Sequence, residues 1–193
     1  MRDLSLALCL LGTPALATGL EIDVAGDARG TIVIDLFEEV APQHVERITT
    51  LAAEDAYDDV VFHRVIDGFM AQTGDVEFGR MGQDMRYAGR GGSSYPDLGQ
   101  EFSDIPFERG IVGMARAQDP NSANSQFFIM FAPAPPLDGQ YTVVGEVVSG
   151  MEVVDLIKRG RGRNGAVIGQ PDRMVDVRVL EDDPEPSEAT EEG

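Results

Sequence analysis

The feature of this sequence that most constrains its fold is a series of short, mostly apolar runs separated by turn signals. Apolar and polar residues tend to alternate within the runs, as in strands, whose successive side chains point to opposite faces of a sheet. Glycine, proline, asparagine and aspartate mark turns between them. Such a series predicts a mainly β domain, either an antiparallel barrel or a sandwich. The predicted strands are 31–37, 60–66, 69–73, 111–117, 126–132, 141–148 and 174–180.

Two segments have the apolar spacing of a helix instead. Pro42 can begin the first, because a proline in the first helical turn sacrifices no hydrogen bond, and apolar residues recur at helical spacing as far as Ala52. The second is a short helix that follows Gly150 and stops at Gly160. Residues 76–108 have no periodicity, and a loop of that length inside a compact domain is usually functional or disordered.

The two ends of the chain have patterns of their own. Residues 1–17 combine a charged start, a short apolar middle and a final Ala-Leu-Ala, which predicts a secretory signal peptide and export to the bacterial periplasm or beyond. Residues 181–193 are mostly acidic and include two prolines, which predicts a disordered tail. A single domain is therefore expected over residues 18–180.

Charge and cysteine content narrow the possible functions. The sequence has 15 basic and 34 acidic residues, a net charge of −19 at pH 7. Such a surface repels phosphate backbones and anionic lipid, which argues against binding to nucleic acid or to a membrane. The one cysteine, Cys9, lies in the predicted signal peptide, so the remaining chain has no thiol chemistry. With only two histidines besides, no metal or other cofactor is expected.

Two segments place polar groups that can act on an amide among large apolar side chains. Residues 62–75 read FHRVIDGFMAQTGD and contain Arg64 and Gln72, and residues 125–129 read SQFFI and contain Gln126. Neither segment has a nucleophile next to a base or a set of metal ligands. The combination suits a site that binds an apolar group and reshapes it without covalent chemistry.

Both segments closely resemble the signature segments of the cyclophilins, a family of peptidyl-prolyl cis-trans isomerases, and the resemblance extends over residues 31–179. It implies an eight-stranded antiparallel closed barrel with an α-helix capping each end. It also implies an enzyme that rotates X-Pro peptide bonds without metal, nucleotide or covalent intermediate. The implied partners are flexible or unfolded proline-containing polypeptides, and a monomer is expected.

The reaction explains why an arginine is useful. Amide resonance sets a rotation barrier of about 18–20 kcal/mol, so X-Pro bonds exchange in roughly 10–100 s. In the twisted amide the proline nitrogen regains its lone pair, and a donor aimed there stabilises the transition state more than the ground state. Arg64, always charged and rich in donors, is the natural candidate. On a strand it would share its face with Phe62 and Ile66.

The resemblance also implies the substrate contacts around the catalytic Arg64. Residues 115–117 resemble the family strand whose backbone pairs with the bound peptide, a mode that demands little of the peptide sequence. Alternation on the strands places Gln126 and Phe128 on one face and Met70 and Gln72 together on another. The implied substrate-binding residues are Phe69, Met70, Gln72, Ala115, Arg116, Ala117, Gln126, Phe128, Leu137 and Tyr141.

Three positions depart from the family pattern. Arg116 stands where asparagine is common and changes the charge of the groove, which leaves client preference open. Pro136 stands where eukaryotic members often have tryptophan, so the surface that binds the drug cyclosporin is reduced. Tyr141 replaces a frequent histidine but still supplies an apolar face and a hydroxyl.

Several alternatives remain at this point. Arg64 could belong to a structural ion pair, since acidic residues are abundant. The chain could also be a non-catalytic cyclophilin-like chaperone that holds proline-containing segments, or a scaffold that acts through its acidic tail. His44 is expected on an exposed helix face, and His63, opposite Arg64 on its strand, is expected to be a packed structural residue.

Overall fold

The computed structural model describes residues 18–162 and 164–181 of the chain. The predicted signal peptide and all but the first residue of the predicted tail lie outside the described residues. The strands are β1 (Thr18–Ala25), β2 (Gly30–Leu36), β3 (Arg64–Ile66), β4 (Met70–Thr73), β5 (Ile111–Met114), β6 (Phe127–Met130), β7 (Val143–Ser149) and β8 (Arg173–Glu181). The helices are α1 (Pro42–Ala53), α2 (Met151–Leu156) and the 3-10 turn η1 (Pro135–Leu137).

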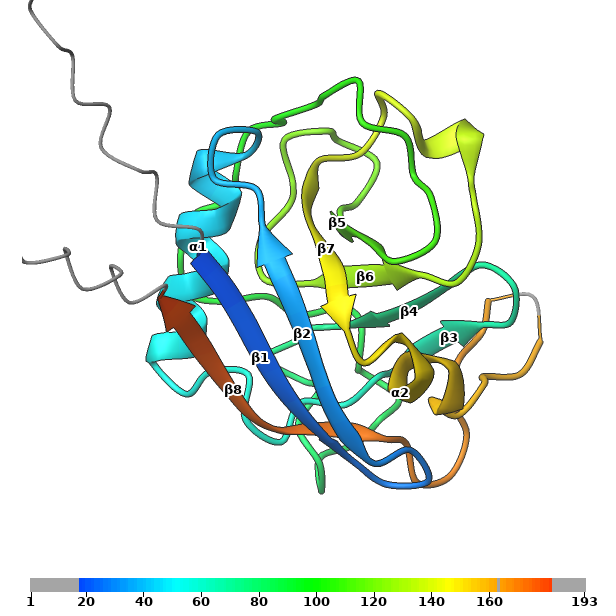
Figure 1. Cartoon of the computed structure of the whole chain (residues 1–193). Coiled ribbons are helices and arrows are strands. Elements are labelled where there is room, and N and C mark those ends of the chain that lie inside the picture. The colour runs from blue at the N-terminus through cyan, green and yellow to red at the C-terminus, as the bar shows by residue number, and fades with distance from the viewer. Residues whose placement is uncertain (1–17, 163, 182–193) are drawn as a thin grey trace, which may run out of the picture.

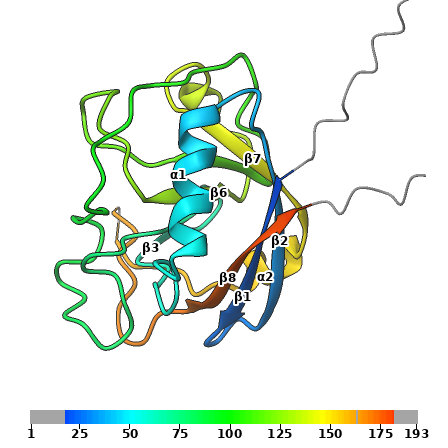
Figure 2. The ribbon, with the colours of Figure 1, turned by 90° about the vertical axis from the view of Figure 1, so that its left-hand side faces the viewer.

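All eight strands belong to one antiparallel sheet, in the order β3-β4-β6-β5-β7-β2-β1-β8. The sheet curls on itself, as Figure 1 shows. Helix α1 lies beside β8 and α2 beside β2, on opposite sides of the curl (Figure 2). The eight antiparallel strands and two capping helices that the family resemblance implied are therefore present.

The barrel is less closed than the resemblance implied. The edge strands β3 and β8 do not pair with each other. Instead, the chain just before β3 meets the start of β8 through an isolated bridge between Val61 and Arg173, with backbone hydrogen bonds of 2.9 Å from Phe62 to Asp172 and from Met174 to Val60. Because β3 begins only at residue 64, the seam has no strand ladder, and the sheet is a curled half-barrel.

Strand β1 is absent from the sequence prediction. Leu20, Ile22 and Val24 point into the core, whereas Glu21 and Asp23 between them are partly exposed. The strand pairs with β2 on one side and with β8 on the other. It therefore joins the C-terminal strand to the rest of the sheet.

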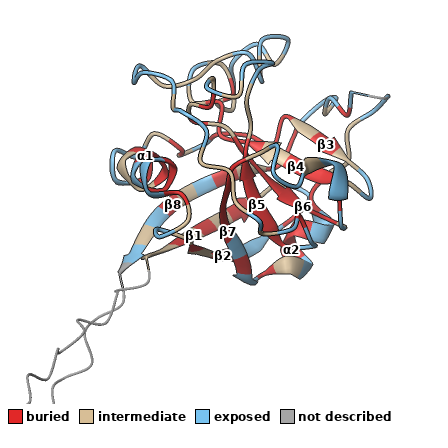
Figure 3. Cartoon of the chain, turned by 90° about the horizontal axis from the view of Figure 1, so that it is seen from above, coloured by how far each residue is buried: buried red, intermediate tan, exposed pale blue. Residues whose placement is uncertain are grey.

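The two faces of β6 serve two separate apolar clusters. Phe127 and Ile129 belong to the main core inside the curl. Phe128 and Met130 belong to a smaller cluster on the other face, together with Met70 of β4. The alternation expected from the sequence is thus confirmed, and the smaller cluster underlies the site described below. Figure 3 shows the buried residues concentrated along the strands and the exposed ones in the loops.

Some predicted strands are shorter in the structure. The run 60–66 contributes only β3, and the run 111–117 contributes only β5, which ends at Met114. As a result Phe62 lies in the main core and does not share a face with Arg64, contrary to expectation.

The segment between β4 and β5 contains no helix or named strand, as predicted, and wraps around the molecule in Figure 2. None of the described helices is long and apolar enough to cross a membrane.

Candidate active site

The register of the sheet aligns the predicted polar and aromatic residues in one row. Arg64 on β3 pairs with Gln72 on β4, which pairs with Phe128 on β6, which pairs with Gly113 on β5. A Cβ atom at Gly113 would lie 2.6 Å from ring atoms of both Phe107 and Phe128. Glycine there lets Phe107 stack on Phe128 with 5.7 Å between ring centroids. This stack fixes the floor of the site.

A hollow of about 140 Å³ opens over this row. Phe128 forms its floor and is only 5% exposed. Because one water occupies about 30 Å³, the hollow has room for the few heavy atoms of a proline ring. Its lining consists entirely of residues predicted for the site: Arg64, Phe69, Met70, Gln72, Ala115, Arg116, Phe128, Leu137 and Tyr141.

The two remaining predicted residues, Ala117 and Gln126, line a larger hollow of about 450 Å³. This hollow shares Gln72, Ala115 and Arg116 with the smaller one, so the two adjoin. Much of its wall comes from residues 89–93, which sequence reasoning did not assign to the site. The sequence signal for them is the run of glycines in the long loop, because loops of that length in a compact domain are usually functional or disordered.

Arg64 is held in place by a chain of hydrogen bonds. Its Nε donates to the carbonyl of Asn164 at 2.9 Å, and its Nη1 donates to Oε1 of Gln72 at 3.0 Å. Gln72 donates in turn to Oε1 of Gln126 at 2.9 Å, and Gln126 donates to the carbonyl of Gly91 at 2.8 Å. The guanidinium is therefore oriented by two direct partners, Gln72 and Asn164, and Gln72 is held in turn through Gln126.

The charge of Arg64 is not neutralised by a carboxylate. Among the described residues it forms no ion pair, whereas Arg109 pairs with Asp155 and Arg173 with Asp59. This removes the support for a structural ion pair at Arg64. Partial burial lowers the pKa of Arg64, but a guanidinium stays protonated at any ordinary pH. An uncompensated cation therefore faces the smaller hollow.

A buried aspartate shapes the wall of the larger hollow. Asp75 is fully buried and accepts four backbone N–H bonds, between 2.7 and 3.1 Å, from Glu77, Phe78, Gly89 and Gly91. Two of these donors lie in the segment that lines the hollow. Asp75, at the end of the first signature segment, thus anchors a loop that lies far from it along the sequence.

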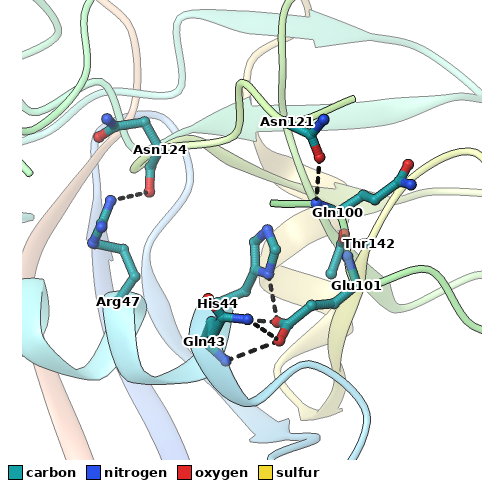
Figure 4. Close-up of polar contacts among 8 residues, drawn as sticks. All are labelled: Gln43, His44, Arg47, Gln100, Glu101, Asn121, Asn124 and Thr142. Carbon is teal, nitrogen blue, oxygen red and sulfur yellow. Dashed lines mark hydrogen bonds and ion pairs between the residues drawn. The ribbon is translucent and has the colours of Figure 1, made fainter. Parts of the chain in front are cut away.

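His44 is buried, so its predicted exposure on α1 is wrong. The long loop folds back over this face of the helix and brings Glu101 within 2.6 Å of His44 Nδ1 (Figure 4). Glu101 also accepts the backbone N–H groups of Gln43 and His44 at 3.2 Å, which satisfies donors at the helix start. Its own N–H donates to Oγ1 of Thr142, beside the site residue Tyr141.

The protonation of this pair follows from its surroundings. Burial lowers the pKa of His44 despite the opposing influence of Glu101, so the ring is neutral, and its Nδ1–H donates a hydrogen bond to the carboxylate of Glu101. Burial alone would raise the pKa of Glu101, but hydrogen bonds from His44 and from two backbone amides hold it below its usual range. Arg47 of α1 also donates to the carbonyl of Pro96 in the long loop, and to that of Asn124, which Figure 4 shows. Helix α1 therefore holds the long loop at Pro96 as well as at Glu101.

Comparison with known proteins identifies the family. A model of the family described as "Cyclophilin type peptidyl-prolyl cis-trans isomerase/CLD" matches residues 20–179, nearly the whole described chain. The chain belongs to the cyclophilin family. As a cyclophilin it falls in an enzyme class, the peptidyl-prolyl cis-trans isomerases.

Named relatives agree with this assignment. A probable peptidyl-prolyl cis-trans isomerase of Brucella suis is 56% identical over 155 residues, which cover 79% of each chain. Peptidyl-prolyl cis-trans isomerase-like 1 of Aspergillus niger is 40% identical over 167 residues, covering 82% of this chain and 91% of the relative. The crystal structure of a cyclophilin type isomerase of Cryptosporidium parvum superposes with a TM-score of 0.71 at 26% identity, covering 86% of this chain and 98% of that one.

The second histidine of this cyclophilin is a packed residue, as expected. His63 is 9% exposed, and both ring nitrogens are buried without a hydrogen-bond partner among the described residues. Burial lowers its pKa to about 4, although Asp75 opposes the shift. The ring is therefore neutral at pH 7. Nor do any three potential metal ligands gather anywhere in the described residues.

The burial of His63 predicts a loss of stability in acid. Its pKa is about 4 when folded against 6.5 when unfolded, so the unfolded state binds more protons in between. The stabilisation is complete above about pH 6.5 and is lost as the pH falls towards 4. At about 1.4 kcal/mol per pKa unit, we expect the free energy of unfolding to fall by about 3 kcal/mol more in the wild type than in His63→Gln between pH 7 and pH 4. Urea unfolding at both pH values measures this, and equal losses in the two proteins would contradict it.

Weak binding of cyclosporin is a further expectation. Pro136 lies exposed in η1, next to the pocket residue Leu137, and offers neither an indole N–H nor a large apolar surface. Calorimetry should give a dissociation constant above 1 μM, and Pro136→Trp should bind more tightly than the wild type. A submicromolar constant for the wild type would contradict the role assigned to this position.

Proposed function

We propose that this cyclophilin catalyses rotation about X-Pro bonds in flexible or unfolded polypeptides and thereby assists the folding of exported proteins. The observation that carries the proposal is the uncompensated guanidinium of Arg64 at the edge of a hollow of about 140 Å³ whose floor is Phe128. A proline ring would occupy the hollow above Phe128. Arg64 would then donate to the nitrogen of the twisted amide, where the lone pair develops.

The groups around Arg64 support the remaining steps. Gln72 and the carbonyl of Asn164 hold the guanidinium, so little reorganisation is needed when the amide twists. The N–H and C=O of Arg116 have no hydrogen-bond partner among the described residues, although residues 115–117 do not form the predicted strand. These groups are available to pair with the backbone of an extended peptide. No step requires a covalent intermediate.

The nature of the partner has independent support. A cyclophilin of Cryptosporidium parvum, 27% identical and with a TM-score of 0.70, has been crystallised in the presence of the dipeptide Ala-Pro, and the matched region covers 84% of this chain and 98% of that one. A proline-containing segment is the corresponding partner proposed for this chain, which we expect to act as a monomer.

Export is proposed from the sequence of residues 1–17, together with the absence of cysteine from the rest of the chain. A chain without thiols avoids unwanted disulfides in an oxidising compartment. Expression of the full chain in a bacterium, followed by fractionation and N-terminal sequencing, tests this proposal. A periplasmic product that begins at Thr18 would support export, whereas an uncleaved cytoplasmic product would overturn it.

The decisive experiment for the activity is exchange of a short peptide with an Ala-Pro-Phe core. Exchange between its cis and trans forms can be followed by NMR at equilibrium, with and without the purified protein. Acceleration at catalytic protein concentrations supports the proposed function. Binding of the peptide without acceleration would favour the alternative, a chaperone that holds proline-containing segments.

A further inference from the structure

The charge of the cleft is opposite to that of the molecule. The chain carries 34 acidic and 15 basic residues. Yet the lining of the two adjoining hollows includes three arginines, Arg64, Arg90 and Arg116, and a single acidic residue, Asp97. Within the described part of the chain none of these arginines forms an ion pair with a carboxylate. A peptide that enters the cleft therefore meets positive charge in an otherwise acidic protein.

Arg116 is the best fixed of these charges. Its Cζ lies 4.4 Å from the centroid of the Tyr141 ring, and its Nη atoms donate to the carbonyls of Ala117, Gln118 and Gln140 at 2.9 to 3.2 Å. These carbonyl dipoles take hydrogen bonds from the Nη atoms without cancelling the charge, and Nε is buried without a partner among the described residues. Since Arg116 lines both hollows, its positive charge acts on both.

The other two charged groups of the larger hollow lie at its surface. Arg90 is exposed, with its guanidinium carbon 6.0 Å from the centroid of the Tyr87 ring. Asp97 is also exposed, and its carboxylate accepts a hydrogen bond from the side chain of Asn124 at 2.9 Å. Asp97 offsets one of the two arginines that line this hollow, and the second carboxylate nearby, Asp75, is buried behind residues 89 and 91, where four backbone N–H groups surround it. The side chains that face the hollow therefore keep a net positive charge.

We infer that the larger hollow selects an acidic side chain on the substrate, within a few residues of the proline. The inference rests on the proposed function and assigns specificity to Arg116 and Arg90. The hollows adjoin, and an extended chain advances about 3.3 Å per residue, so a neighbouring side chain reaches the second hollow while the proline occupies the first. The positive charges of Arg116 and Arg90 attract a carboxylate, and the exposed guanidinium of Arg90 also has the shape to contact both carboxylate oxygens.

The size of the effect follows from the partly solvated position of the cleft. One additional charge at a few ångströms in such a setting changes affinity by about threefold to tenfold. We therefore expect kcat/KM about fivefold higher for a peptide with glutamate than for its glutamine counterpart, and lowest for lysine. Since the charges are accessible to ions, about 0.5 M NaCl should remove most of this preference.

The experiment uses two sets of peptides, Ac-Xaa-Ala-Pro-Phe-NH2 and Ac-Ala-Ala-Pro-Xaa-NH2, in which Xaa is Glu, Gln or Lys. Both ends are capped, so the side chain of Xaa is the only charge that varies. The quantity measured is the Glu-to-Gln ratio of kcat/KM by NMR exchange. We expect a ratio of about five in at least one set, falling towards one in Arg116→Gln and in the double variant with Arg90→Gln. Asp97→Asn should raise the ratio.

Arg29→Gln is the matched control. Arg29 is exposed in the turn between β1 and β2 and forms no ion pair among the described residues, so its replacement removes the same charge away from the cleft and should leave the ratio unchanged. Equal rates for Glu, Gln and Lys peptides would overturn the inference while leaving the proposed function intact. No acceleration of any peptide would instead overturn the proposed function. If the Glu-to-Gln ratio of kcat/KM falls as much in Arg29→Gln as in Arg116→Gln, the preference comes from the net charge of the protein and not from the cleft.

Discussion

Replacing Arg64 with alanine is expected to lower kcat/KM for an Ala-Pro-Phe peptide by about 10²- to 10³-fold. The variant loses a single oriented donor at the site where charge develops, and such losses cost about 3–4 kcal/mol in transition-state stabilisation. Arg64→Lys should recover little activity, since one ammonium cannot reproduce the planar fork that contacts both Asn164 and Gln72.

The controls separate chemistry from folding. Arg64 is half-buried at the end of a short edge strand, so its removal should change the free energy of unfolding by only about 1 kcal/mol. Arg29→Gln should retain full activity. If Arg64→Ala stays within about threefold of the wild type while remaining folded, another donor acts on the amide, and the assignment of Arg64 as the catalytic residue fails.

Replacing Asp75 with alanine should cause the largest loss of stability of any substitution considered, about 4 kcal/mol or more. Each hydrogen bond to a charged group contributes roughly 1.5–3 kcal/mol, and Asp75 accepts four backbone N–H groups that would lose their partner. That loss is a large part of the roughly 5–15 kcal/mol that stabilises a typical domain. Asp75→Asn, which keeps one acceptor oxygen, should lose about half as much.

Urea unfolding measures these losses, with Asp84→Ala as the control. Asp84 lies in the same long loop but is exposed, and its partner Arg86 is exposed as well, so its replacement should leave the free energy of unfolding unchanged within error. A loss of under 1 kcal/mol in Asp75→Ala would show that water replaces the carboxylate. Because Gln126 donates to the carbonyl of Gly91, Asp75→Ala should also disturb the hydrogen-bond chain that ends at Arg64.

The sequence alone predicts most of the site because the site lies on strands. A two-residue period assigns Gln72, Phe128 and Met70 to their faces without knowledge of the fold, and the signature segments supply the remaining residues. The same period was available for β1, where Leu20 and Ile22 alternate with acidic residues. The local pattern of this segment is therefore that of a strand with one buried face.

Other features were beyond any local pattern. His44 has the position of an exposed helix residue, and it is buried only because Glu101, 57 residues later in the chain, returns to cover it. The seam of the half-barrel likewise joins Val61 to Arg173, two residues that lie far apart in the sequence. Contacts of this kind depend on how loops close in three dimensions, and short-range periodicity contains no information about that closure.

By itself, the sequence determined the mainly β architecture, the family, and the residues that line the cleft, because alternation and signature segments are local properties. Only the tertiary structure decided that the charge of Arg64 is not neutralised, that Asp75 anchors the loop at residues 89–91, and that three arginines gather in the cleft of an acidic chain. Electrostatic and hydrogen-bond interactions act through space, so their partners become known only when distant segments are brought together.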